Sequence, residues 1–134
     1  MDLRKALVVG IDNYPTSPLR GCINDANAVA SILKTNGNGS PNFDVRVYTD
    51  VKRQSDLRCL IRETFDGESD TRLFYFSGHG ASFGTRSFIV TPDYEPSNEG
   101  ISMEEVLEVA NGSGSGNRVV ILDCCHSGAF GSPG

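Results

Sequence analysis

Two apolar runs that end in reactive residues constrain this chain more than any other feature. Residues 119–122 read Val-Val-Ile-Leu and are followed at once by Asp-Cys-Cys-His-Ser-Gly. Residues 73–76 read Leu-Phe-Tyr-Phe and are followed by Ser-Gly-His-Gly. Four consecutive apolar residues are typical of a short strand buried on both faces. If the two strands are parallel neighbours, His79 and the Cys124–Cys125 pair meet at the carboxyl edge of one sheet, where open α/β sheets carry reactive groups.

The first half of the chain contains further strand and helix patterns. Buried-strand candidates cover residues 5–12 and, more weakly, residues 45–48. One helix is predicted to begin at about Asn24, with Asn24 or Asp25 as its cap. A second helix is predicted over residues 55–65, and its first residue, a serine, is the expected cap.

The second half continues the alternation of strands and helices. A small strand is predicted over residues 88–90, and Ser102 with Glu105 forms a capping-box pattern that starts a helix to about Ala110. Residues 111–117 are rich in Gly and Ser and are expected to be a flexible connection. The order β-α-β-α-β-(hairpin)-α-β predicts a mostly parallel sheet with right-handed crossovers and helices on both faces.

Length and charge limit the function classes. The 134 residues form one domain, and the net charge of −5 argues against a general binder of nucleic acid or anionic membranes. The apolar run over residues 6–11 is too short for a signal peptide, and no window is long enough to span a bilayer. The four cysteines are too few for a disulfide framework, so we expect thiols in a reducing compartment and a cytoplasmic protein. These cysteines are Cys22, Cys59, Cys124 and Cys125.

A thiol that faces an imidazole is a nucleophile with its acid–base partner. His79 lies between two glycines, which allow close backbone approach, although it can also be read as a turn residue without a catalytic task. Cys125 is the better nucleophile because small residues follow it, and Cys124 is expected to pack against the sheet. The neighbouring His126 is read as a turn-stabilising side chain.

Together these motifs resemble the paired motifs of the metacaspases, the caspase-like cysteine peptidases of plants, fungi, protists and bacteria. Cys125 lies 46 residues after His79, close to the ~50 residues that separate the two in caspases. Residues 21–26, Gly-Cys-Ile-Asn-Asp-Ala, resemble the loop before the first helix of the family. The resemblance implies a caspase-like three-layer α/β/α sandwich with a mostly parallel sheet. Residues 1–134 would be the large-subunit half of the catalytic domain, without the small-subunit segment.

The resemblance also implies a cysteine endopeptidase, made as a zymogen, that hydrolyses amides through a thioester. Cys125 attacks the carbonyl, and His79 manages the proton and protonates the leaving amine. The backbone N–H groups of Gly80 and Cys125 would form the oxyanion hole. No third catalytic side chain is visible, so a Cys-His dyad is predicted.

Metacaspases cleave after Arg or Lys and use residues that match Cys22, Asp25, Ser77 and Asp123 for this pocket. Two carboxylates beyond the ends of neighbouring strands would hold a guanidinium or ammonium group. Without the resemblance, Asp25 could equally be read as the cap of the predicted helix. The expected partners are protein or peptide substrates with Arg or Lys before the scissile bond, together with a small-subunit segment or partner chain.

Calcium is the cofactor that the resemblance suggests. Many metacaspases bind it through acidic side chains between the histidine and the cysteine. The acidic residues in that interval are Asp93, Glu95, Glu99, Glu104 and Glu105. They include no run of paired aspartates, and calcium needs six to eight oxygen ligands. The sequence therefore predicts no required cofactor and leaves calcium as an alternative.

Two other classes of function compete with the peptidase. The first is a catalytically silent caspase-like scaffold or regulatory module that needs a partner segment. The second is a metal site built from the two histidines with Cys124 and Cys125, which is unfavourable because adjacent residues do not easily converge on one tetrahedral ion. No metal ligand is predicted.

Overall fold

The computed structural model describes the backbone of residues 4–126 and the side chains of residues 4–124. Within this range, six strands form one mixed sheet. They are β1 (Arg4–Gly10), β2 (Asp44–Thr49), β3 (Thr71–Phe83), β4 (Arg86–Ile89), β5 (Ile101–Ser102) and β6 (Asn117–His126). Four of them are parallel in the order β2-β1-β3-β6, and β4 and β5 extend the end of β3 as antiparallel strands.

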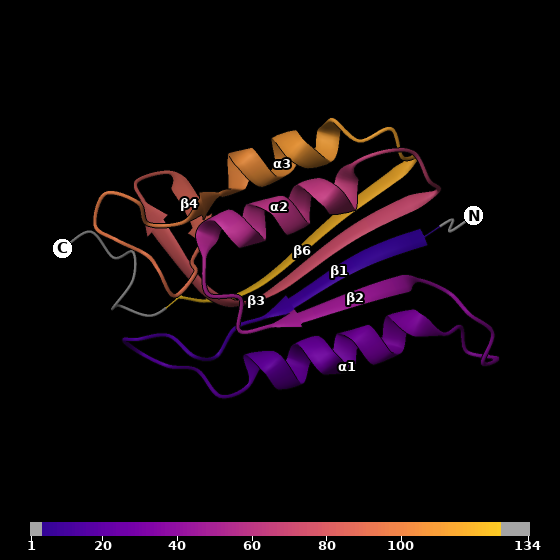
Figure 1. Ribbon diagram of the computed structural model, residues 1–134, viewed down its shortest axis with the longest axis horizontal. Helices are drawn as coiled ribbons and strands as arrows, with labels where there is room; N and C mark the ends of the chain where they lie inside the picture. The colour runs from indigo at the N-terminus through magenta and orange to yellow at the C-terminus, as the bar shows by residue number, and fades with distance from the viewer. Residues whose placement is uncertain (1–3, 127–134) are drawn as a thin grey trace.

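Three helices of the described range cover the two faces of the sheet, as Figure 1 shows. Helix α1 (Cys22–Lys34) lies against one face, and α2 (Gln54–Phe65) and α3 (Met103–Asn111) lie side by side on the other. None of these helices is long and apolar enough to cross a membrane. The predicted three-layer α/β/α arrangement with a mostly parallel sheet is confirmed.

Each face of the sheet has its own apolar layer because successive side chains of a strand point to opposite sides. The layer under α1 is built from Ala6, Val8, Ala26, Ala30, Leu73 and Tyr75. The layer under α2 and α3 is larger, and its members include Leu7, Val9, Leu57, Ile61, Phe74 and Phe76. Strands β1 and β3 contribute to both layers, which makes them the centre of the fold.

The cap of the first helix differs from the prediction. Helix α1 begins at Cys22, and no side chain at its N-cap position, Gly21, is available as a cap. Instead, the Asp12 carboxylate at the end of β1 accepts hydrogen bonds from the backbone N–H groups of Cys22 (2.9 Å) and Ile23 (3.3 Å). The expectation that Asn24 or Asp25 caps this helix is wrong, because a more distant carboxylate satisfies the first N–H groups.

Helix α2 is also capped by a distant carboxylate, whereas α3 is capped by the serine that its local sequence predicts. The serine expected to cap α2 does not do so; the Asp93 carboxylate accepts from the backbone N–H of Gln54, at 3.1 Å to each oxygen. In α3, the Ser102 hydroxyl accepts from the backbone N–H of Glu105 at 3.1 Å, which confirms the predicted cap. Local cap motifs are therefore reliable here only where no distant carboxylate competes.

The connection before β6 is packed rather than flexible. Ser113 and Ser115 are buried, and the Ser113 hydroxyl accepts from the backbone N–H of Ser115 at 3.2 Å. The Ser115 hydroxyl also lies 3.2 Å from that of Ser69, in the loop just before β3. The small Gly and Ser residues therefore allow this connection to pack closely against the loop before β3.

Replacing Gly10 by alanine is expected to lower the free energy of unfolding by about 3 kcal/mol, a typical cost of overpacking. A Cβ at Gly10 would lie 2.7 Å from the carbonyl oxygen of Cys22 and 2.8 Å from the Cβ of Ala26, so β1 and α1 would have to separate. Urea unfolding followed by circular dichroism measures the effect. The matched control is Gly37→Ala, where nothing lies within 4 Å. Equal unfolding midpoints for the two variants would contradict the close packing.

Candidate active site

The two predicted reactive motifs lie side by side on neighbouring parallel strands. In the register of β3 and β6, Ser77 is opposite Asp123, Gly78 is opposite Cys124, and His79 is opposite Cys125. Both motifs belong to continuous strands, because β3 extends to Phe83 and β6 to His126. The strands therefore do not end before the motifs, as the four-residue apolar runs suggested, but the two motifs meet at one edge of the sheet as expected. The side chains of Cys125 and His126, and residues 127–134, lie outside the described part.

The imidazole of His79 is held in a buried and well-defined position. Its exposed fraction is 1 %, and its Nε2 lies 2.6 Å from the backbone carbonyl oxygen of Ser17. A carbonyl oxygen only accepts hydrogen bonds, so Nε2 carries a proton. In the neutral ring the lone pair is then on Nδ1, the nitrogen that can take up a proton.

Tyr14 braces the same histidine. The two rings meet edge to face with centroids 4.5 Å apart, and the backbone N–H of His79 donates to the Tyr14 hydroxyl at 3.0 Å. That hydroxyl in turn donates to the carbonyl of Val90 at 2.8 Å. A Cβ at Gly78 would lie 2.6 Å from the Tyr14 oxygen, which explains why glycine precedes the histidine.

The loop that carries the Ser17 carbonyl is pinned from two sides. Asp50 accepts from the backbone N–H groups of Asp12 and Asn13, each at 3.0 Å, and the Asp12 carbonyl accepts from Leu19 at 2.8 Å. Ser17 and Asp50 both adopt a positive φ, of 58° and 53°. Such conformations persist where the surroundings enforce them, often at functional sites. Sequence reasoning missed this group because a backbone carbonyl has no side-chain signature.

A polar cluster surrounds the hydroxyl of Tyr75. This hydroxyl donates to the Asp123 carboxylate at 3.2 Å and also makes a hydrogen bond with the Ser77 side chain. Burial raises the pKa of Tyr75 to about 12; the Ser77 hydrogen bond opposes this rise, and the charges of Asp123 and Asp25 add to it. The structure thus places two of the four residues predicted for the basic-residue pocket, Ser77 and Asp123, opposite each other on neighbouring strands, and the third, Asp25, lies in the first turn of α1. The fourth, Cys22, is buried one helical turn before Asp25 on α1.

Tyr75 is a second residue that sequence reasoning missed. It lies in an apolar run, and its ring belongs to the buried layer under α1. The available signal was its hydroxyl, because a buried tyrosine O–H normally finds a hydrogen-bond partner.

The acidic residues between the two motifs mostly have protein partners. Asp93 caps α2, Glu105 pairs with Arg58 at 2.7 Å, and Glu104 pairs with Arg86 at 3.4 Å. Within the described part of the chain, no three His, Cys, Asp or Glu side chains gather as metal ligands need to.

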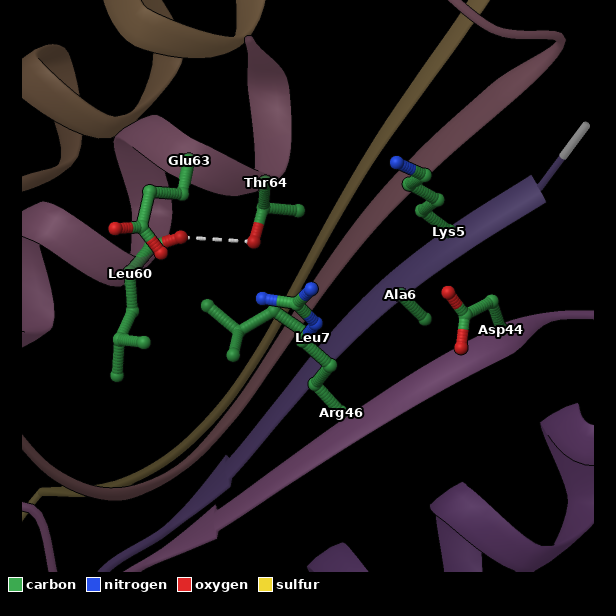
Figure 2. Close-up of a pocket in the computed structure, with 8 residues that line it drawn as sticks. All are labelled: Lys5, Ala6, Leu7, Asp44, Arg46, Leu60, Glu63 and Thr64. Atoms are coloured by element: carbon green, nitrogen blue, oxygen red, sulfur yellow. Dashed lines mark hydrogen bonds between the residues drawn. The ribbon is translucent and has the colours of Figure 1, made fainter. Parts of the chain in front are cut away.

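One cavity borders the second reactive motif, and a second pocket lies at the opposite end of the sheet. Cys124 packs against the larger apolar layer and lines a cavity of about 230 Å³ with Leu122 and Met103, in agreement with its predicted packing role. A smaller pocket of about 70 Å³, shown in Figure 2, lies between α2 and the first residues of β1 and β2. One of its lining residues, Lys5, is opposite Arg72, seven residues before His79 on β3, roughly 23 Å along an extended strand. This pocket is therefore separate from the candidate active site.

Comparison with known proteins agrees with this geometry. The family model of the caspase domain matches residues 3–133. Metacaspase-1 of Saccharomyces cerevisiae strain YJM789 is 33 % identical over 146 residues, which cover 93 % of this chain and 33 % of the relative. Metacaspase-1 of Mycosarcoma maydis is 29 % identical over 147 residues (93 % and 36 %), and metacaspase-1A of Aspergillus terreus is 28 % identical over 146 residues (94 % and 36 %). The chain spans about a third of the length of these curated relatives. By its sequence and its sheet, the chain belongs to the caspase-domain family of cysteine peptidases, and the three relatives named above are metacaspases.

Proposed function

We propose that this chain is the catalytic segment of a metacaspase-type cysteine endopeptidase that hydrolyses peptide bonds after Arg or Lys. The observation that carries the proposal is the register of β3 and β6, which sets the backbone of His79 directly opposite that of Cys125. A nucleophile and its base are recognised by such proximity, because proton transfer requires hydrogen-bond reach.

In the proposed reaction, the sulfur of Cys125 attacks the substrate carbonyl carbon and its proton passes to His79. The backbone N–H groups of Gly80 and Cys125 stabilise the resulting oxyanion. His79 returns the proton to the leaving amine as the C–N bond breaks, and water then hydrolyses the thioester. The Ser17 carbonyl, 2.6 Å from Nε2, orients the ring and stabilises the imidazolium that forms.

The polar cluster around Tyr75 supports a preference for cationic side chains. Asp123 accepts from the Tyr75 hydroxyl, the charge of Asp25 contributes to the raised pKa of Tyr75, and neither carboxylate has an ion-pair partner among the described side chains. Carboxylates at this edge of the sheet suit a guanidinium or ammonium group, and we assign Ser77 and Cys22 to the same pocket.

The open edge of β6 supports a role for a further segment or partner chain. Within residues 4–126, β6 pairs only with β3, and Ile121 in its middle is 43 % exposed. An unpaired edge strand is a template for another strand. The same observation favours the second candidate function, a catalytically silent caspase-like scaffold or regulatory module that pairs with a partner segment.

The test compares fluorogenic peptides that end in Arg, Lys or Asp, with calcium and with EDTA, and follows alkylation of the cysteines by mass spectrometry. We expect cleavage after Arg and Lys, no cleavage after Asp, and loss of activity when iodoacetamide modifies Cys125. Equal cleavage of the Asp peptide would rule the assignment out. Cleavage of no peptide, with Cys125 alkylated no faster than the exposed Cys59, would favour the silent module.

A further inference from the structure

We propose that Tyr75 sets the preference of this site for arginine over lysine by holding the Asp123 carboxylate in one orientation. The inference rests on the proposed function and extends it to a positioning residue that the metacaspase resemblance did not supply. It starts from the 3.2 Å hydrogen bond between the Tyr75 hydroxyl and Asp123 Oδ2.

The ring of Tyr75 is anchored, so its hydroxyl is a fixed donor. The side chain is 5 % exposed and packs in the apolar layer between the sheet and α1, with Ala26 and Ala30 of that helix. A phenol has only two side-chain torsions, and both are restrained when the ring is buried. The Asp123 carboxylate, by contrast, is exposed, and without the hydroxyl it would rotate freely.

The direction of the hydrogen bond to Asp123 is also defined. A carboxylate oxygen accepts, so the Tyr75 hydroxyl donates to Asp123 Oδ2, and the same hydroxyl shares a second hydrogen bond with the Ser77 side chain. Because the pKa of Tyr75 is about 12, the phenol remains a neutral donor throughout the pH range of an enzyme assay. One oxygen of Asp123 is thereby occupied and the plane of the carboxylate is set, which leaves the other oxygen for a ligand.

A fixed carboxylate matters more for one cation than for the other. A guanidinium is planar and presents several N–H groups in a rigid fork, so it binds best to oxygens of defined orientation. An ammonium is a compact charge with three rotatable donors and tolerates a mobile carboxylate. Asp25, the other carboxylate of the proposed pocket, would supply a further acceptor for the same fork.

The kinetic test is Tyr75→Phe, which removes the hydroxyl and keeps the buried ring. We expect kcat/KM for an Arg peptide to fall about tenfold, mostly through KM, as loss of a hydrogen bond to a charged group does. For a Lys peptide we expect a fall of about twofold, so that the Arg-to-Lys ratio falls about fivefold. The alkylation rate of Cys125 should not change.

The matched control, Tyr48→Phe on β2, removes the hydroxyl of an exposed tyrosine and should leave the cleavage of both peptides unaffected. An unchanged Arg-to-Lys ratio in Tyr75→Phe would overturn the inference.

A binding test separates this inference from the peptidase proposal. With [13Cζ]-tyrosine in all four tyrosines, the Tyr75 resonance is identified by its absence from Tyr75→Phe. We expect n-propylguanidine to shift that resonance in the wild-type chain at a lower concentration than n-butylamine does. A shift without cleavage of any peptide would support the role of Tyr75 and reject the peptidase. Peptide cleavage with no shift by either probe would do the reverse.

Discussion

Replacing Cys125 by alanine is expected to lower kcat/KM for an Arg peptide by at least about a thousandfold, the usual cost of removing a covalent nucleophile. Replacing His79 by asparagine should cost about as much, because the thiol then lacks the group that accepts its proton. Residues that act as one unit are strongly non-additive, so the double variant should be no worse than either single one. Steady-state kinetics of the three variants against wild type measures all of this.

Two controls distinguish a catalytic defect from a general effect of removing a thiol and from misfolding. Cys59→Ala removes an exposed thiol on α2 and should leave kcat/KM unchanged. His79 is buried against Ser17 and Tyr14, so each variant is first compared with wild type by thermal unfolding. More than about a tenth of the activity remaining in a folded Cys125→Ala would contradict the assigned nucleophile, because such losses are characteristically much larger.

Replacing Asp123 by asparagine is expected to reduce kcat/KM for Arg and Lys peptides about a hundredfold, because a charge-assisted interaction at the substrate is lost. The amide is nearly isosteric, and its oxygen can still accept from the Tyr75 hydroxyl, so the fold should be preserved. Asp25→Asn should act in the same direction, and the two changes should couple because both carboxylates meet one cation. Peptide kinetics with each variant and the double variant provides the measurement.

A neutral substrate and a control variant test whether the charge of Asp123, rather than the shape of its side chain, determines the kinetics. A citrulline peptide is a neutral analogue of the Arg peptide, and its slow cleavage should be the same in wild type and in Asp123→Asn. Asp44→Asn changes an exposed carboxylate at the far end of the sheet and should leave the kinetics unaltered. If Asp123→Asn cleaved the Arg peptide as well as wild type does, the pocket would lie elsewhere.

The spacing of apolar residues along the chain was sufficient to predict the layers of this fold. The apolar runs that became β1, β3 and β6, and the helical spacing that became α1 and α2, predicted which segments are buried. The reason is that a buried strand or helix face has to be apolar whatever its neighbours are. The same patterns brought His79 and Cys125 to one edge, because parallel strands place their carboxyl ends together.

The details that position the candidate site came from contacts between distant residues. Asp12 and Asp93 cap helices that local motifs assigned to other residues, and Asp50 pins the loop whose Ser17 carbonyl meets His79. In each case a backbone group takes whichever partner tertiary packing brings nearest, and one-dimensional spacing does not record that choice.

By itself, the sequence determined the chemistry on offer and its place in the fold: a thiol and an imidazole on adjacent buried strands, with carboxylates nearby. Only the tertiary structure decided how that chemistry is held. It extended the motifs into continuous strands, directed a backbone carbonyl at Nε2 of His79, and joined the Tyr75 hydroxyl to Asp123. The physical reason is that hydrophobic burial is a property of each segment, whereas hydrogen bonds between remote groups exist only after the layers have packed.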